Sequence, residues 1–522
     1  MPVLKKIPFP AYCLLLTTYL LISCHADNPA EKRSYGDTII KGGFQKLSPI
    51  NPLLSISSES SDLEPLIFDG LIKIDEKGEP QSNLSSSWDI SEDGLIWRFY
   101  LRKGIRFHDE IELTAEDVIF TYGIIKNHER YSNFFEIVKD MGAVNKYTVE
   151  ITLKKPYVPF LYGLEVGILP KHKFNQHPIG TGPYKVDKWS EDEIILKANE
   201  RYFNGRPYLN RIIIKSFPNQ KVIWARLMRG EIDFSREITP SDYEIIKNIP
   251  SFKTYSALKP YYYMIAFNMS RAKALPYNDK QVRKALNYAV DKEKIINKVL
   301  KGMGKVSAGT IYPLSWAYYH DIKHYPYNPR KALELLKEAG WEDTDNNHIL
   351  DKNGKELIFT LLINKGDKIK ERCAMLIQEQ LLDIGIKLQI EFLDLTSMSK
   401  RCLQREFESA FIEIISKADP DINYRFWHSS QIDRGLNIFS YKNQRLDELL
   451  DKGRATFDKE KRKEYYIDFQ KEMLDDPPGI FLFWTEYLVG IHERFKDVKV
   501  DWRGTFANIT EWYVPEKKQK YK

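Results

Sequence analysis

Strand-like and helix-like segments alternate through the body of this chain, and residues that begin and end helices mark several of the boundaries. In the segment NPRKALELLKEAGW, Asn328 can cap a helix, Pro329 suits its first turn and Gly340 can end it. A second helical pattern stops at Gly385, and apolar residues then alternate over residues 386–392, as in a half-buried strand. This alternation predicts an α/β fold, in which helices cover the faces of sheets.

The acidic segment DTDNNHILDKNG, which begins at Asp343, imitates a calcium-binding loop at its first, third and fifth positions. Its sixth residue is His348, where such a loop needs glycine, and its twelfth is Gly354, where it needs a bidentate glutamate. We therefore predict a polar turn that leads through a short hairpin into the strand LIFTLLI, and no metal site.

The first residues have the pattern of an export signal. Lys5 and Lys6 precede an apolar run from Ala11 to Ser23, which is too short to span a bilayer because a spanning helix needs about 20 apolar residues. The run ends in Leu-Ile-Ser-Cys, which resembles the lipobox of bacterial lipoproteins. The resemblance implies cleavage after residue 23, lipidation of Cys24 and a tether over residues 24–35. The alternative is a plain signal with a chance cysteine.

Charge and cysteine content exclude several classes of protein. Loss of two lysines with the signal lowers the net charge from +6 to +4, a weak bias that does not favour nucleic-acid binding. Past Cys24 the chain has only Cys373 and Cys402, too few for a disulfide framework. Cys373 falls on the apolar face of a predicted helix, which indicates a buried thiol.

No catalytic constellation is present in the sequence. The chain has no G-x-S-x-G, no H-E-x-x-H and no phosphate-binding glycine loop. His108, His172 and His177 have no partner at the spacing of a metal or catalytic pair. We therefore expect neither an enzyme nor a bound cofactor.

Several motifs, taken in order, resemble one family. They include LIFDGLIKID from Leu66, the block from Leu84 to Tyr122, PIGTGPYKVDKW from Pro178 and RYFNGRPYLNRI from Arg201. RLMRGEIDF, NDKQVRKALNYAVDKEKI and NPRKALELLKEAGW follow. The chain is similar over nearly all of its mature length to the extracellular solute-binding proteins of ABC importers, in the branch that binds peptides and nickel complexes.

This resemblance implies an α/β, two-lobed fold of the periplasmic-binding-protein type, with a hinge between the lobes. Domain I would comprise residues 36–64, 180–263 and 486–522. Domain II would be the insert 65–179, and domain III would be the second lobe, 264–485. The resemblance also implies a monomer in the cell envelope that hands its solute to a membrane permease, with the lipid on Cys24 as its link to the bilayer.

This chain has no acidic residue at the position where peptide-binding members of the family have the aspartate that binds the ligand amine. Peptide-binding members hold the ligand amine with an aspartate in domain III, and aligned on Pro420 that position falls near Ser416. Two acids could substitute for it. Glu413 lies out of pattern in the strand FIEII, where a ligand site and a solvent-facing position are equal alternatives, and Asp419 adjoins the turn.

Other candidates for ligand contacts are Arg401, Tyr262 and Tyr263. Arg401 falls near a family arginine that binds the ligand carboxylate, and it could equally be a surface residue of a helix. The tyrosines belong to the run YYYMIAF, in which alternate side chains of a strand face opposite ways, so some of the rings can line a cleft.

Three functions remain open at this stage. The first is a receptor that captures a peptide for import. The second is a receptor of the same fold for another solute, such as a metal chelate, a sugar or an opine. The third is a sensor or holdase without transport. A receptor for a peptide should have a long cleft, and a receptor for a metal chelate should have a small pocket with arginine or histidine.

Overall fold

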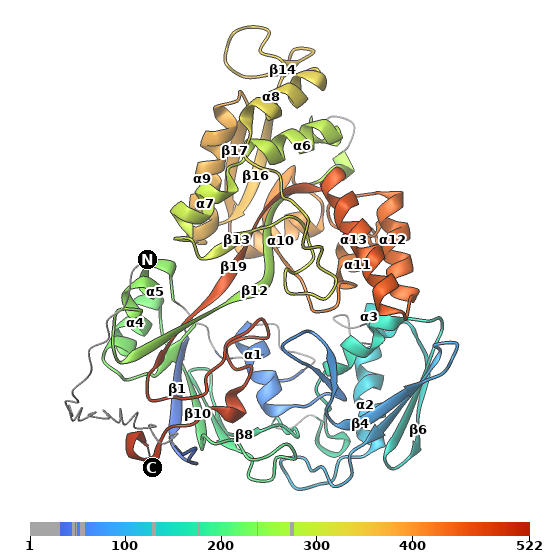
Figure 1. Cartoon of the computed structure of the whole chain (residues 1–522), viewed down its shortest axis with the longest axis vertical. Coiled ribbons are helices and arrows are strands. Elements are labelled where there is room, and N and C mark those ends of the chain that lie inside the picture. The colour runs from blue at the N-terminus through green and yellow to red at the C-terminus, as the bar shows by residue number, and fades with distance from the viewer. Residues whose placement is uncertain are drawn as a thin grey trace, which may run out of the picture.

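The computed structural model describes residues 32–43, 47, 50–52, 58–127, 132–174, 178–236, 238–271 and 276–521. Cys24, the predicted signal and most of the predicted tether lie outside these ranges. The described chain forms two lobes, one above the other in Figure 1, joined by the long strands β12 (Phe252–Phe267) and β19 (Gly479–His492). None of the described helices is long and apolar enough to cross a membrane.

One mixed sheet runs through both lobes in the order β17-β16-β18-β12-β19-β11-β1-β10-β9-β8, with β13 also on β19. In the upper lobe lie β13 (Gly304–Val306), β16 (Ile358–Asn364), β17 (Lys387–Leu393) and β18 (Ser409–Ile415). In the lower lobe lie β1 (Thr38–Gly43), β8 (Tyr184–Trp189), β9 (Glu193–Ala198), β10 (Arg211–Ser216) and β11 (Phe234–Ser235).

The antiparallel pairing of β12 with β19 changes register where the two lobes meet. Leu258 pairs with Glu486, and the next pair is Tyr262 with Trp484, so β12 carries extra residues at this point. Such an irregularity bends a strand. We call the part of the chain between Leu258 and Glu486 the second lobe and the rest the first lobe. The predicted domain boundaries at 263/264 and 485/486 fall within these two strands and remain a prediction.

In the second lobe the side chains of β12 alternate between two cores. Odd-numbered residues 263–267 pack in a core with α6 (Lys280–Ala289), α7 (Lys292–Val299), α8 (Pro329–Glu338) and α9 (Lys368–Leu382). Even-numbered residues 262–266 pack with α10 (Leu395–Leu403), α11 (Ile422–Trp427), α12 (Gln444–Ala455) and α13 (Lys459–Asp475). Helices on both faces of the strand make this lobe a three-layer α/β unit.

The first lobe contains a smaller antiparallel sheet that lies below α12 and α13 in Figure 1. Its order is β4-β5-β7-β6, and α2 packs on it. The bounds are β4 (Ser85–Ile90), β5 (Ile96–Leu101), β6 (Val138–Asn145), β7 (Thr148–Leu153) and α2 (Ala115–Lys126). Shorter elements are α1 (Ser58–Ile67), β2 (Ile72–Ile74), β3 (Pro80–Ser82), α3 (Ser132–Phe135), α4 (Gln220–Met228) and α5 (Pro240–Ile246).

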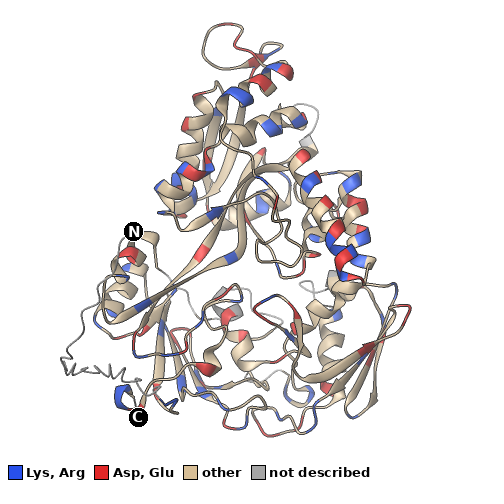
Figure 2. Ribbon diagram, in the orientation of Figure 1, with Lys and Arg blue, Asp and Glu red and all other residues tan. Residues whose placement is uncertain are grey.

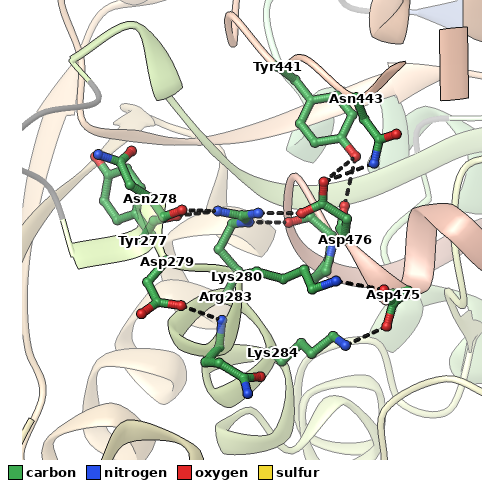
Figure 3. A network of polar contacts seen from close by, with 12 residues as sticks. Tyr277, Asn278, Asp279, Lys280, Arg283, Lys284, Tyr441, Asn443, Asp475 and Asp476 are labelled. Atoms are coloured by element: carbon green, nitrogen blue, oxygen red, sulfur yellow. Dashed lines mark hydrogen bonds and ion pairs between the residues drawn. The ribbon is translucent and has the colours of Figure 1, made fainter. Parts of the chain in front are cut away.

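A polar network ties α6 to the start of β19 (Figure 3). The guanidinium of Arg283 donates to the carbonyl of Pro477 at 2.9 Å and pairs with the carboxylate of Asp476. It also donates to the carbonyls of Tyr277 at 2.7 Å and Asn278 at 2.8 Å. The network therefore fixes the turn from which β19 enters the sheet.

Local predictions from the sequence are confirmed in several places. Asn328 caps α8, and its side chain accepts from the amide of Lys331. Gly340 and Gly385 have φ of +83° and +78°, the left-handed conformation that ends a helix. A short hairpin of β14 (Asp351–Lys352) and β15 (Lys355–Glu356) follows the acidic turn.

Candidate ligand-binding cleft

A cleft of about 1750 Å³ lies between the two lobes. The first lobe lines it mainly with residues from 62–77, 134–167 and 503–510, and the second lobe with residues from 415–436 together with Arg454. These segments are far apart in the sequence, and the two strands that join the lobes bring them together. A ligand held there would touch both lobes.

The turn around Pro420 forms part of the wall of the second lobe. Asp419 receives two hydrogen bonds from the guanidinium of Arg462, at 2.6 and 2.8 Å. The two side chains are only 5% and 3% exposed, so this is a buried, bidentate ion pair. Asp419 also accepts the amide of Asp421 at 2.9 Å, which places Asp421 at the start of α11. Residue 419 thus organises the turn.

Asp421 joins the two lobes. It accepts a hydrogen bond from the hydroxyl of Tyr157 in the first lobe at 2.8 Å and pairs with Nε of Arg454 in the second lobe at 2.9 Å. The guanidinium of Arg454 lies 4.8 Å from the ring centre of Tyr157 and 3.5 Å from that of Tyr424. Burial raises the pKa of Asp421, and the charge of Arg454 opposes that rise.

Further contacts between the lobes surround this group. Lys459 at the start of α13 pairs with Glu79 of the first lobe. The ring of Phe457 lies so close to Gly94 that a Cβ atom there would be 2.6 Å from it. The ring centre of Phe457 is also 6.3 Å from that of Trp97. The lobes therefore touch at this side of the cleft in addition to the strands that connect them.

A buried carboxylate orders the wall of the first lobe. Asp69 accepts hydrogen bonds from Asn83 at 3.1 Å, Thr181 at 2.9 Å and Tyr202 at 3.1 Å. Burial raises the pKa of Asp69, and these three donors oppose that rise. The bond from Thr181 attaches the GTGPY loop to the segment that lines the cleft, so this part of the wall is fixed before a ligand arrives.

The walls carry equal numbers of charges of each sign. The nine acidic residues are Asp62, Glu64, Asp69, Asp75, Glu76, Glu136, Glu165, Asp419 and Asp421. The nine basic residues are Lys73, Lys77, Lys154, Lys155, Lys417, Arg425, Arg434, Arg454 and Arg503. The view of Figure 2 likewise shows both signs interspersed over both lobes. Such a cleft suits a ligand with charges of both signs better than a strongly anionic or cationic one.

Comparison with known proteins identifies the family. The model of the bacterial extracellular solute-binding proteins, family 5 (middle region), matches residues 79–434. The chain belongs to this family. It is 32% identical over 513 residues to the oligopeptide-binding protein AppA of Bacillus subtilis, an alignment that covers 94% of each protein.

Three solved structures of the same fold show the similarity in space. AppA of Bacillus subtilis in complex with a nonapeptide has a TM-score of 0.79, with 92% of this chain and 100% of that chain covered. NikZ of Campylobacter jejuni in complex with Ni(L-His) is also 32% identical with a TM-score of 0.79, at 91% and 99% coverage. DppA of Helicobacter pylori with the peptide STSA is 26% identical with a TM-score of 0.77, at 92% and 99% coverage.

Membership in family 5 confirms the predicted family and the predicted two-lobed α/β fold. Of the residues predicted to bind ligand, the structure places Asp419 in the wall of the cleft. Its carboxylate is already occupied by Arg462. A ligand amine would have to compete with a buried bidentate pair at this position.

Glu413 lies in β18, and its side chain is exposed and does not line the cleft. It pairs in register with Tyr263 of β12. Burial is the main reason that the pKa of Tyr263 is raised, and the charge of Glu413 adds to it. This placement favours the solvent-facing alternative that the sequence left open.

Arg401, Tyr262 and Tyr263 are also not among the residues that line the cleft. Arg401 in α10 pairs with Glu391 at 2.5 Å. Tyr262 is 1% exposed and Tyr263 8%, and each packs in one of the two cores beside β12. Burial of the rings in the protein interior leaves little of either for a ligand.

Tyr157, Asp421 and Arg454 were not singled out from the sequence. The only local signal was the doubled acid in ADPDIN, which places Asp421 two residues after Asp419. Tyr157 and Arg454 reach it from distant segments, so nothing in their own neighbourhoods marked them.

The described residues contain one group of acids close enough to hold a metal ion, formed by Asp343, Asp345 and Asp351. It lies at the tip of the second lobe, by β14, away from the cleft (Figure 1). Asp343 accepts the amide of His348 at 3.0 Å, and Asp351 accepts the amide of Thr344 at 2.8 Å. These bonds give the carboxylates a structural role in the turn.

Proposed function

We propose that this protein captures a peptide in the cleft between its lobes and delivers it to the permease of an ABC importer. The size of the cleft carries the proposal. At about 1750 Å³ it exceeds the roughly 300–1,000 Å³ of ordinary small-molecule pockets. Its balanced charges suit a zwitterion with polar backbone groups. The relatives AppA and DppA, whose structures hold peptides, support the same assignment.

A second candidate is a receptor for a metal chelate. NikZ, in complex with Ni(L-His), is as similar in identity to this chain as AppA is. Two observations favour the peptide. The cleft is large for a chelate, and no histidine is among the described residues that line it.

The proposal includes an anchor. The Leu-Ile-Ser-Cys sequence supports lipidation of Cys24, which would keep an exported monomer close to its permease without a spanning helix. We expect labelled palmitate to enter the parent protein and not the Cys24→Ala variant. Equal labelling of both would remove the anchor from the proposal.

Isothermal titration of the purified protein tests the ligand. The probes are a panel of di- to nonapeptides and, separately, Ni²⁺ with excess L-histidine. We expect tight binding of at least one peptide class and no heat with the nickel complex. Because the chain shows no catalytic constellation, we also expect mass spectrometry to recover the bound peptide uncut. If the protein binds the nickel complex and none of the peptides, its ligand is a metal chelate and not a peptide.

A further inference from the structure

Glu165 is an acidic residue on the cleft wall of the first lobe. It ends the 3-10 helix η1 (Val158–Glu165), and its side chain is exposed and lines the cleft. Its backbone packs closely on Gly70, because a Cβ atom on Gly70 would lie 2.4 Å from the carbonyl oxygen of Glu165. The side chain therefore lines the cleft, and its backbone packs closely against the segment at Gly70.

Three other carboxylates of the cleft wall have partners that hold them in place. Asp419 holds Arg462, Asp421 holds Arg454 and Tyr157, and Asp69 accepts three side-chain donors. Glu165 differs from them. It accepts the amide of Ile74 at 3.2 Å, and within the described part of the chain no lysine or arginine lies at ion-pair distance from it.

The nearest positive charges act on Glu165 only from a distance. Lys417 of the second lobe and Arg503 of the first lobe both lower its pKa, and burial, the largest influence, raises it. Arg503 is held by Asp501 at 2.5 Å. Closing the cleft around a ligand would remove more water from Glu165, and a buried carboxylate without a close cation is costly. The ligand can supply that cation.

We propose that Glu165 receives a primary ammonium group of the ligand, which in a peptide is its N-terminal amine. This inference rests on the proposed peptide-binding function and adds to it the group that orients the ligand. It assigns recognition of the amine to the first lobe. Glu413 and Asp419, the acids that the sequence suggested, both belong to the second lobe.

The test compares three proteins with two forms of one ligand. The proteins are the parent, Glu165→Gln and Glu92→Gln, and the ligand is the tightest peptide of the panel, free and N-acetylated. Glutamine keeps the oxygen that accepts the amide of Ile74. Glu92 is the matched control, because it is another exposed glutamate of the first lobe and is not among the residues that line the cleft. Thermal melting checks that each variant is folded.

We expect Glu165→Gln to bind the free peptide about a hundredfold more weakly than the parent, as for the loss of one partner of a desolvated ion pair. N-acetylation of the peptide should weaken its binding to the parent by a similar factor and its binding to Glu165→Gln only a little. The reason is that acetylation and the substitution remove the same contact. Glu92→Gln should behave as the parent does.

Two results would overturn the inference, and they differ from failure of the proposed function. If acetylation weakens the parent and Glu165→Gln equally, another group binds the amine. If acetylation has no effect on the parent, the amine is not recognised at all. If the parent binds no peptide of the panel, the proposed function fails, and the inference fails with it.

Discussion

His108 is held in its neutral form by two backbone groups of the GTGPY loop. The amide of Gly180 donates to Nδ1 at 3.3 Å, and Nε2 donates to the carbonyl of Gly182 at 3.0 Å. Burial lowers the pKa of this imidazole from 6.5 to about 4. A ring that accepts on one nitrogen and donates from the other cannot take a second proton without losing a bond.

This arrangement predicts a loss of stability in mild acid. Between pH 6.5 and about 4 the unfolded chain binds a proton at His108 and the folded chain does not. The free energy of unfolding therefore falls as the pH is lowered through this window, by up to about 3 kcal/mol. Urea unfolding at both ends of the window measures it. His108→Gln should have a shallower pH dependence than the parent, and the exposed control His320→Gln should not.

For single residues, the sequence predicted the place of a side chain along the chain better than it predicted which groups that side chain contacts. It placed Asp419 beside a turn, yet Arg462, which occupies its carboxylate, lies 43 positions further on in α13. It marked Glu413 as out of pattern but could not show to which side of β18 that residue points. Such contacts depend on packing between distant elements, which a local pattern does not contain.

A helix could be predicted from the sequence where its own residues mark its beginning and its end. The cap of Asn328 and the left-handed Gly340 act within one helix, and the structure has α8 where the sequence placed it. The order of strands in the large sheet was not readable from these signals. β12 and β19 pair along their length although most of the second lobe separates them in the sequence.

The attachment of α6 to β19 yields a prediction about one element. Arg283→Met would leave the carboxylate of Asp476 and several carbonyls without their shared donor in a buried place (Figure 3). We expect a loss of about 3–5 kcal/mol in the free energy of unfolding. Lys284→Met is the control, because Lys284 pairs with the exposed Asp475, and an exposed pair contributes about 0–1 kcal/mol. Urea unfolding that ranks the two variants equally would contradict the structural role of Arg283.

At the scale of the whole molecule, the lobes are joined in two different ways. β12 and β19 form a covalent connection that is present whatever the state of the cleft. The contacts of Tyr157, Glu79 and Gly94 with the second lobe exist only when the lobes are together. A ligand that touches both lobes stabilises the same arrangement, so these contacts and the ligand act on one equilibrium.

Removing the hydroxyl of Tyr157 should shift the equilibrium between closed and open lobes while leaving the packing of the ring in place. Tyr157→Phe keeps the ring beside Arg454 and removes two hydrogen bonds across the lobes, the one donated to Asp421 and a longer one accepted from Arg454 at 3.3 Å. A hydrogen bond to a charged group contributes about 1.5–3 kcal/mol, so the ratio of closed to open molecules should fall by roughly tenfold to a hundredfold. Peptide affinity should fall by up to that factor, since a ligand that needs the closed state must offset the difference.

A matched control shows whether the effect of Tyr157→Phe comes from the contact between the lobes or from the loss of any tyrosine–aspartate hydrogen bond. The hydroxyl of Tyr100 donates to Asp89 at 2.8 Å, the same distance as Tyr157 to Asp421, but both residues belong to the first lobe. In small-angle scattering without ligand, Tyr157→Phe should have a larger radius of gyration than the parent, and Tyr100→Phe should not. Saturating peptide should bring Tyr157→Phe back to the parent's value, because ligand contacts with both lobes favour the same closed state. If its radius stays equal to the parent's and its affinity is unchanged, the bond to Asp421 does not control closure, and the covalent strands and the remaining contacts suffice.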